Sequence, residues 1–132
     1  MIYLDSCALV KLIIPEAETA ALRSYLDRHN DKRHIASSLA RTEVRRALIR
    51  QNLGPESLSA AEGVLARFTL LGIDDALLDA AGSFSHRWLR SLDAIHLATG
   101  HSFKLALSAF VTYDKRLTEA ADQLGLPTRA PV

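Results

Sequence analysis

Four acidic residues lie far apart in the chain, each at a point where an α/β fold would direct it towards a shared pocket: Asp5, Glu43, Asp93 and Asp114. Two like charges about 4 Å apart repel by roughly 4 kcal/mol at an effective dielectric constant near 20, so converging carboxylates need a compensating cation. Because no cluster of Cys or His accompanies them, the oxygen ligands favour a hard ion, Mg²⁺ or Mn²⁺. Such an ion binds a phosphate oxygen and activates a water for attack on phosphorus. These residue types therefore predict phosphodiester hydrolysis.

Three of the four residues have an equally simple structural explanation. Asp5 and Asp114 end the β-prone runs MIYLD and AFVTYD, where an Asp commonly caps the helix that follows. Glu43 borders the apolar face of its helix, and an isolated Glu at this position is expected to pair with Arg46 or Arg50. The catalytic interpretation depends on all four residues meeting in one place.

Asp93 is harder to explain as a surface residue, because it lies in the apolar segment LRSLDAIHLA. It either caps the helix, with Ser91 outside, or lies within the helix. Inside the helix, a partly buried Asp without a partner is destabilising, and a metal ion or a basic side chain is the natural compensation.

The elements that must position these residues alternate along the chain. Hydrophobic periodicity, caps and breakers predict strands over residues 2–4, 33–37, 69–73, 107–114 and 127–132. Helices are predicted in between, with Asp5-Ser6, Ser38, and Asp74 or Asp75 as caps and Pro55 at a first turn. Alternating strands and helices predict an α/β fold with a central, mainly parallel β-sheet flanked by helices, in a single domain over residues 1–132.

Composition limits where the protein acts and what it binds. The chain has 132 residues, 48% of them hydrophobic, and a formal net charge of +1, so any phosphate-binding surface must be local. A single cysteine, Cys7, excludes an intramolecular disulfide and indicates a reducing, cytoplasmic location. The longest apolar stretch, ALVKLII, is far shorter than the roughly 20 residues of a membrane span, and no targeting leader is expected.

Read together, the segments MIYLDSCALVKL, SSLARTEVRRAL, LRSLDAIHLATG and AFVTYDKRLTEAADQLGLP closely resemble the PIN-domain nucleases, and within them the VapC toxins of toxin–antitoxin pairs. The resemblance covers the whole chain and implies a PIN-like fold. It implies a Mg²⁺- or Mn²⁺-dependent endoribonuclease toxin that a cognate VapB-type antitoxin neutralises, and a homodimer. The resemblance places the metal and catalytic site on all four acidic residues, with Ser6 and Thr112 in supporting positions.

Several other residues invite a functional interpretation. Arg41, Arg45, Arg46 and Arg50 make the helix around Glu43 the most basic segment, which is either a phosphate-positioning surface or an ordinary solvated face. His96 is expected to be a satisfied structural residue, and Cys7 a buried, inert thiol. Trp88, with Phe84 and Leu89, is expected to contribute to packing or to a dimer face.

Two other classes of function remain open at this stage. Phosphatases and phosphotransferases with a strand-end Asp nucleophile need a second Asp two residues later, where this chain has Cys7, and receiver-type domains do not need Glu43 or Asp93. A non-enzymatic binding module of the same fold would use the acidic residues as caps and surface charges. Such a module predicts that the acidic residues contribute to stability without any dependence on metal.

Overall fold

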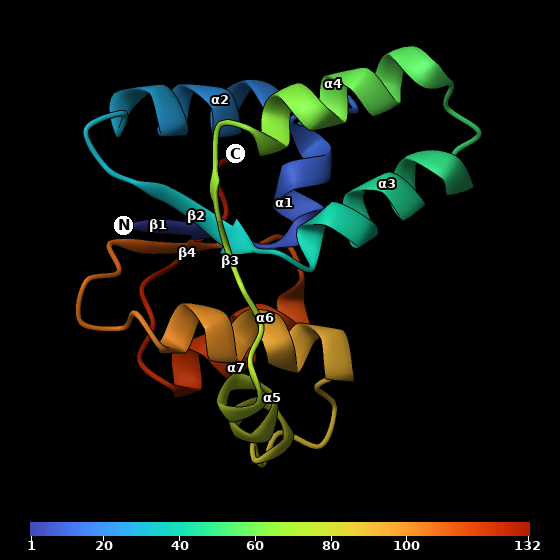
Figure 1. The fold of residues 1–132 in the computed structure, drawn as a ribbon. Coiled ribbons are helices and arrows are strands. Elements are labelled where there is room, and N and C mark those ends of the chain that lie inside the picture. The colour runs from blue at the N-terminus through green and yellow to red at the C-terminus, as the bar shows by residue number, and fades with distance from the viewer.

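The computed structural model describes residues 1–132 and contains a five-stranded, all-parallel sheet in the order β3-β2-β1-β4-β5 (Figure 1). The strands are β1 (Ile2–Leu4), β2 (His34–Ser37), β3 (Thr69–Leu71), β4 (Ala109–Val111) and β5 (Thr128–Arg129). The helices are α1 (Ser6–Lys11), α2 (Thr19–Arg28), α3 (Ala40–Arg50), α4 (Pro55–Leu65), α5 (Asp75–Gly82), α6 (Ser91–His101) and α7 (Lys115–Gln123). The predicted α/β class with a parallel sheet flanked by helices is confirmed.

The sheet separates two hydrophobic cores because successive strand residues point to opposite faces. Ile2 and Leu4 of β1 pack with helices α1 to α4 on one face, whereas Tyr3 packs with α6 and α7 on the other. Figure 1 shows the same division, with α1 to α4 above the sheet and α5 to α7 below it. All three residues of β1 are fully buried, as expected for the central strand of a parallel sheet.

Helix α6 lies close against the sheet at Gly100. A Cβ atom at this position would lie 2.5 Å from the Phe110 ring, so any larger residue would push the helix away from β4. Phe110 in turn stacks on Tyr3, with ring centroids 4.9 Å apart. This close contact holds the buried face of α6 against β1 and β4, which matters for the position of His96.

Local predictions of caps and packing were mostly confirmed, with two exceptions. The N-terminal position of α3 is Leu39, without a side-chain cap, so the predicted cap by Ser38 is wrong. The Ser38 N–H instead bonds to the Leu71 carbonyl at 2.8 Å, which ties the turn after β2 to the end of β3. Trp88 is 77% exposed, so the predicted packing holds for its neighbours Phe84 and Leu89 but not for Trp88, whose alternative role in a dimer face stays a prediction. None of the helices combines the length and the apolar composition that crossing a membrane requires.

Candidate active site

All four acidic residues line one cavity of about 690 Å³. Asp5 directly follows β1 and Asp114 follows β4, so both lie at the carboxyl edge of the sheet, where open α/β folds place their binding sites. Glu43 and Asp93 reach the same cavity from the first turns of α3 and α6. Four segments that are distant in sequence thus contribute one carboxylate each.

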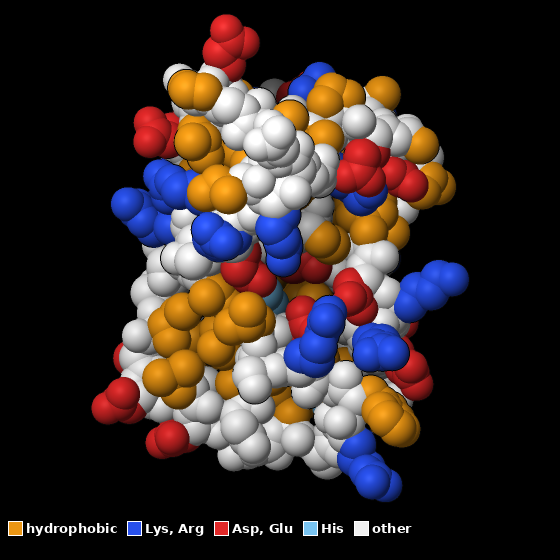
Figure 2. Space-filling model, turned by 90° about the vertical axis from the view of Figure 1, so that its right-hand side faces the viewer, with side chains coloured by type: hydrophobic (Ala, Val, Ile, Leu, Met, Phe, Trp, Pro, Cys, Tyr) orange, Lys and Arg blue, Asp and Glu red, His pale blue; other side chains and the backbone are white.

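The surface around this cavity has charges of both signs (Figure 2). Asp and Glu side chains lie in a hollow in the middle of the face, with Lys and Arg side chains above and to one side of them, and a hydrophobic area on the other. The cavity is lined by Lys11, Arg50 and Arg90 in addition to the acidic residues. A negatively charged hollow bordered by cations can hold a metal ion together with a phosphate group.

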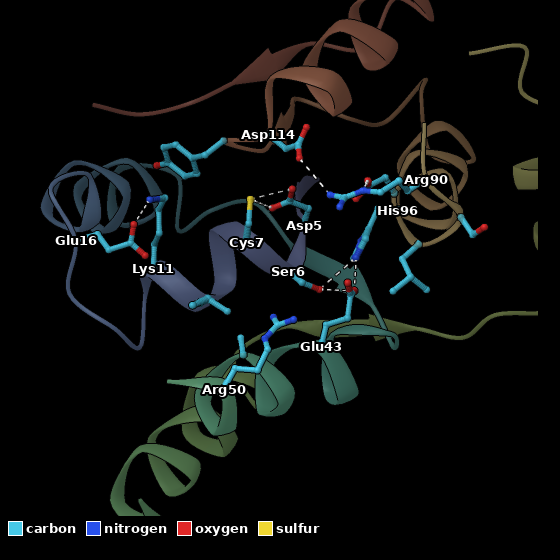
Figure 3. A pocket seen from close by; sticks show the side chains of 16 residues that line it. Asp5, Ser6, Cys7, Lys11, Glu16, Glu43, Arg50, Arg90, His96 and Asp114 are labelled. Carbon is cyan, nitrogen blue, oxygen red and sulfur yellow. Dashed lines mark hydrogen bonds and ion pairs between the residues drawn. The ribbon is translucent and has the colours of Figure 1, made fainter. Parts of the chain in front are cut away.

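Asp5 is 3% exposed and is held by several hydrogen bonds (Figure 3). Its Oδ1 accepts from the Ala8 N–H at 2.9 Å, which caps α1, and its Oδ2 accepts from the Thr112 hydroxyl at 2.5 Å. Burial raises the pKa of Asp5, and the hydrogen bonds from Thr112, Cys7 and Ala8 lower it by less. The predicted cap and the predicted pocket residue are therefore the same side chain, and Thr112 contacts it as the resemblance implied.

Glu43 is fixed by two donors that the sequence did not reveal as its partners. The Ser6 hydroxyl donates to Oε1 at 2.7 Å, and His96 Nε2 lies 2.6 Å from the same oxygen (Figure 3). Burial opposes ionisation, but the hydrogen bond from His96, with smaller contributions from the Ser6 hydrogen bond and the Arg50 charge, lowers the pKa of Glu43. The expected pairing with Arg46 or Arg50 is replaced by contacts with α1 and α6.

His96 connects Glu43 to the interior of the protein. It is 2% exposed, and its Nδ1 lies 2.6 Å from the hydroxyl of the fully buried Tyr3. The Tyr3 hydroxyl donates to Nδ1, so Nε2 carries the proton and donates to Glu43. The hydrogen-bond network thus assigns the Nε2–H tautomer to His96. His96 is a satisfied structural residue, as expected, but it also orients a site carboxylate. The sequence did contain a clue, since His96 lies three residues after Asp93 and therefore on nearly the same side of α6.

Asp93 and Asp114 are held together by one arginine. Arg90 Nε lies 3.2 Å from Asp93 Oδ2, and Arg90 Nη2 lies 4.0 Å from Asp114 Oδ2. Asp93 lies inside α6 and does not cap it, so the compensation that its position requires is supplied here by a basic side chain. Asp114 also caps α7 by accepting from the Leu117 N–H at 3.0 Å. Sequence reasoning did not single out Arg90.

Cys7 differs from its predicted environment, because its side chain is exposed at the cavity. The prediction of a buried thiol is wrong, since α1 turns this residue towards the opening beside Asp5. Desolvation of the sulfur at the cavity wall, followed by the charge of the Asp5 carboxylate and the hydrogen bond to it, raises the pKa of the Cys7 thiol well above its usual range. The thiol thus stays protonated and donates weak hydrogen bonds to Asp5 at 3.0 and 3.1 Å, as expected of an inert group.

The basic residues of α3 do not all face the cavity. Arg50 lines it, whereas Arg41, Arg45 and Arg46 do not. Arg45 lies 3.7 Å from Glu62 of α4 and also donates to the Arg41 carbonyl. Lys11 also lines the cavity, but its ammonium is paired with Glu16 and Glu18. Arg50 is therefore the arginine of α3 that is placed to meet a bound phosphate.

Comparison with known proteins agrees with this architecture. Residues 2–123 match the PIN domain family. Ribonuclease VapC35 of Mycobacterium tuberculosis is 45% identical over 133 residues, which cover 99% of this chain and 97% of that protein. Ribonuclease VapC46 of the same organism is 44% identical over 130 residues, or 98% and 97% of the two chains.

Two solved structures share the fold at low sequence identity. One is the crystal structure of VapBC2 from Rickettsia felis bound to a DNA fragment from their promoter, with a TM-score of 0.78 at 12% identity over 100% of both chains. The other is FitAcB from Neisseria gonorrhoeae, with a TM-score of 0.74 at 20% identity, covering 99% of this chain and 98% of that chain.

Proposed function

Because the chain belongs to the PIN-domain family and, within that family, to the group of the VapC ribonucleases, we propose that it is an endoribonuclease toxin. It hydrolyses RNA phosphodiester bonds and is neutralised by a cognate VapB-type antitoxin. The observation that carries this proposal is the convergence of Asp5, Glu43, Asp93 and Asp114 on one cavity at the carboxyl edge of the sheet.

Mg²⁺, or Mn²⁺ in its place, is the proposed cofactor, and the four carboxylates are its proposed ligands and the catalytic residues. The donor chemistry fits, because hard divalent ions prefer carboxylate oxygens and the cavity gathers four of them. No group of three or more His, Cys, Asp or Glu side chains is yet spaced to hold an ion, and Arg90 pairs with two of the carboxylates. When bound, the ion supplies a Lewis acid for phosphate and an activated water.

The protein's own residues prepare the site for that chemistry. Thr112 fixes Asp5, while Ser6 and His96 fix Glu43, so both carboxylates keep one orientation before any ligand arrives. Such outer contacts are typical of metal sites, where they orient the ligands and tune their basicity. Arg50, on the wall of the cavity, contacts the phosphate backbone of the substrate.

The contribution of Arg50 can be separated from that of the other arginines of α3. Because Arg50 lines the cavity and Arg46 does not, Arg50→Ala should weaken RNA binding several-fold, and Arg46→Ala should leave it nearly unchanged. Binding of labelled RNA in a filter or anisotropy assay measures both. Unchanged affinity in Arg50→Ala would show that α3 does not take part in phosphate binding.

Partners and assembly belong to the same proposal. The identity with ribonuclease VapC35 and the shared fold with VapBC2 of Rickettsia felis support a VapB-type antitoxin as the partner. We further propose that residues 1–132 act as a single PIN domain, that the protein forms a homodimer and that it works in the cytoplasm.

The function is tested by incubating the purified, antitoxin-free protein with total RNA in Mg²⁺, Mn²⁺ or EDTA, beside the Asp93→Asn variant. New 5′ ends are then mapped by sequencing. We expect cuts that require a metal and disappear in Asp93→Asn. A folded protein that neither cleaves RNA nor shows a metal-dependent thermal shift would instead be a binding module in which the acidic residues act as caps.

A further inference from the structure

Trp88 is exposed on a segment that is itself firmly anchored. It is the only tryptophan of the chain and 77% exposed, although Phe84 and Leu89 on either side of it pack against the core below the sheet. The segment that joins α5 to α6 therefore cannot bury the indole without giving up those contacts. A large aromatic side chain held in solvent on a fixed backbone is typical of a binding surface.

Trp88 forms one wall of a groove distinct from the acidic cavity. The groove has a volume of about 560 Å³, within the range of small-ligand sites, and lies between the α5–α6 segment and α7. Its charged residues are Arg87, Arg116 and Glu119. Arg87 and Arg116 are exposed and form no ion pair with an acidic side chain. Both guanidinium groups are thus available to a ligand.

The groove and the acidic cavity are lined by the same two segments of chain. Arg90 and Asp114 line the acidic cavity, whereas Arg87 and Arg116 of the same segments line the groove. Arg90 also lies 4.0 Å from Asp114, so the two segments that line both sites meet at the acidic cavity. The groove is thus placed to receive the continuation of an extended ligand bound in the acidic cavity.

We infer that this groove holds a nucleotide next to the scissile phosphate of a single-stranded RNA substrate. Trp88 stacks on its base, and Arg87 and Arg116 bind its phosphates. Aromatic stacking combined with free cations is the way proteins bind single strands without reading their sequence. The four carboxylates repel the RNA backbone, so cations beside them are needed to retain it. The inference rests on the proposed ribonuclease function and assigns part of its substrate site.

A second copy of the chain or another protein fits this groove less well. Only three of its eight lining residues are hydrophobic, and it contains three charged side chains, whereas the centre of a protein interface is depleted of charge. A protein partner covering Trp88 is nevertheless a distinct outcome of the test below.

Trp88 itself reports on the proposed contact, because no other tryptophan contributes to the fluorescence. The Asp93→Asn variant, which we expect to bind RNA without cutting it, is titrated with a short single-stranded RNA of mixed sequence. We expect saturable quenching of the Trp88 emission that weakens as salt is raised.

Affinity is then measured by anisotropy of the labelled RNA in the same background. We expect Trp88→Ala to raise the Kd about 10-fold or more, Trp88→Phe to restore most of the affinity, and Leu105→Ala, at another exposed apolar residue, to have no effect. Arg87→Gln and Arg116→Gln should each reduce the salt slope by about 0.7. Thermal melts of all variants should coincide, because the substituted side chains are exposed.

Two results would overturn the inference and leave the proposed function intact. One is an unchanged Kd of Trp88→Ala for RNA, together with normal RNA cleavage by the wild-type protein. The other is a wild-type dimer that Trp88→Ala converts to a monomer in sedimentation, which would make this surface an interface between copies. If the wild-type protein neither binds nor cleaves RNA, the proposed function fails and the inference fails with it.

Discussion

The cavity contains two pairs of carboxylates that are held in different ways. Asp5 and Glu43, the inner pair, are hydrogen-bonded to donors on α1, on α6 and directly after β4, most of which are buried. Asp93 and Asp114, the rim pair, share one guanidinium whose side chain is 72% exposed. The inner pair is therefore oriented mainly by buried donors, whereas the rim pair shares a side chain that can leave, with Asp114 also held by the Leu117 N–H.

This difference shows how one site can be both rigid and able to accept ligands. A carboxylate that is already held by hydrogen bonds loses little conformational freedom when a ligand arrives. A solvent-exposed ion pair contributes about 0–1 kcal/mol and breaks readily, so a metal ion or a phosphate can replace Arg90 at low cost. Ligand exchange is thus expected at the rim, with the inner pair as a fixed reference.

The largest expected effect is a loss of RNA cleavage that is similar for the two pairs. The pairs should differ in how the substitution changes the stability of the metal-free protein. Asp5→Asn and Asp93→Asn should each lower RNA cleavage by more than about 100-fold, since each removes a proposed ligand whose ion supplies several kcal/mol. Without metal at pH 7, however, Asp5→Asn should raise the melting temperature, because it removes a buried charge and Asn still caps α1. Asp93→Asn should change the free energy of unfolding by less than about 0.5 kcal/mol. A lower melting temperature for Asp5→Asn would contradict the assigned burial of charge.

The next effect tests whether His96 orients the inner pair. His96→Gln should lower cleavage or Mn²⁺ affinity by about 10- to 100-fold, as is usual when an outer contact of a metal site is lost. Tyr3→Phe should have a smaller effect on cleavage and on Mn²⁺ affinity, because the contact between His96 and Glu43 remains. It should destabilise the fold by about 1–3 kcal/mol, because His96 Nδ1 loses its partner. His101→Gln, at an exposed position of the same helix, is the matched control. Isothermal titration measures the Mn²⁺ affinity, and thermal melts measure the stability. Equal Mn²⁺ affinities for His96→Gln and His101→Gln would rule out the orienting role of His96.

The two inner carboxylates should also respond to pH in opposite directions. The folded state lowers the pKa of Glu43, so its contribution to stability is present above the usual Glu pKa and is lost as pH falls through the lowered value. The folded state raises the pKa of Asp5, so its contribution is present below the usual Asp pKa and is lost as pH rises through the raised value. Denaturant unfolding without metal over about pH 3 to 7 measures this for wild-type protein, Asp5→Asn and Glu43→Gln. As pH rises, the free energy of unfolding relative to wild type should increase for Asp5→Asn and decrease for Glu43→Gln. A change in the same direction for both variants would contradict the assigned environments.

The smallest effect is expected at the rim. Arg90→Ala should leave the free energy of unfolding within about 0.5 kcal/mol of wild type, because the side chain is largely exposed. It should strengthen Mn²⁺ binding by roughly 2- to 10-fold, because a competing positive charge is removed from Asp93 and Asp114. Arg87→Ala, outside the acidic cavity, provides the control. Weaker Mn²⁺ binding in Arg90→Ala would mean that the rim pair depends on this arginine to stay in place.

Most of the fold and the composition of the site could be predicted from local patterns. The β-prone run over residues 2–4, Pro55 in the first turn of a helix and the caps Asp5 and Asp74 each depend on residues close in sequence. Ser38 was mispredicted because a neighbouring strand, distant in sequence, holds its N–H. Local rules describe the chain correctly wherever tertiary contacts do not compete with them.

The sequence by itself determined the order of the elements and the four acidic residues that end at the carboxyl edge of the sheet. Periodicity and capping suffice for the order of the elements and for Asp5 and Asp114, because parallel strands bring their carboxyl ends to one edge, whereas the family resemblance was needed to place Glu43 and Asp93 in the site. Only the tertiary structure decided how each carboxylate is held. The contact from Tyr3 to His96 spans 93 residues and that from Thr112 to Asp5 spans 107, and no local pattern encodes such pairings. The balance between burial and hydrogen bonding, which raises the pKa of Asp5 and lowers that of Glu43, likewise exists only once the helices have packed on the sheet.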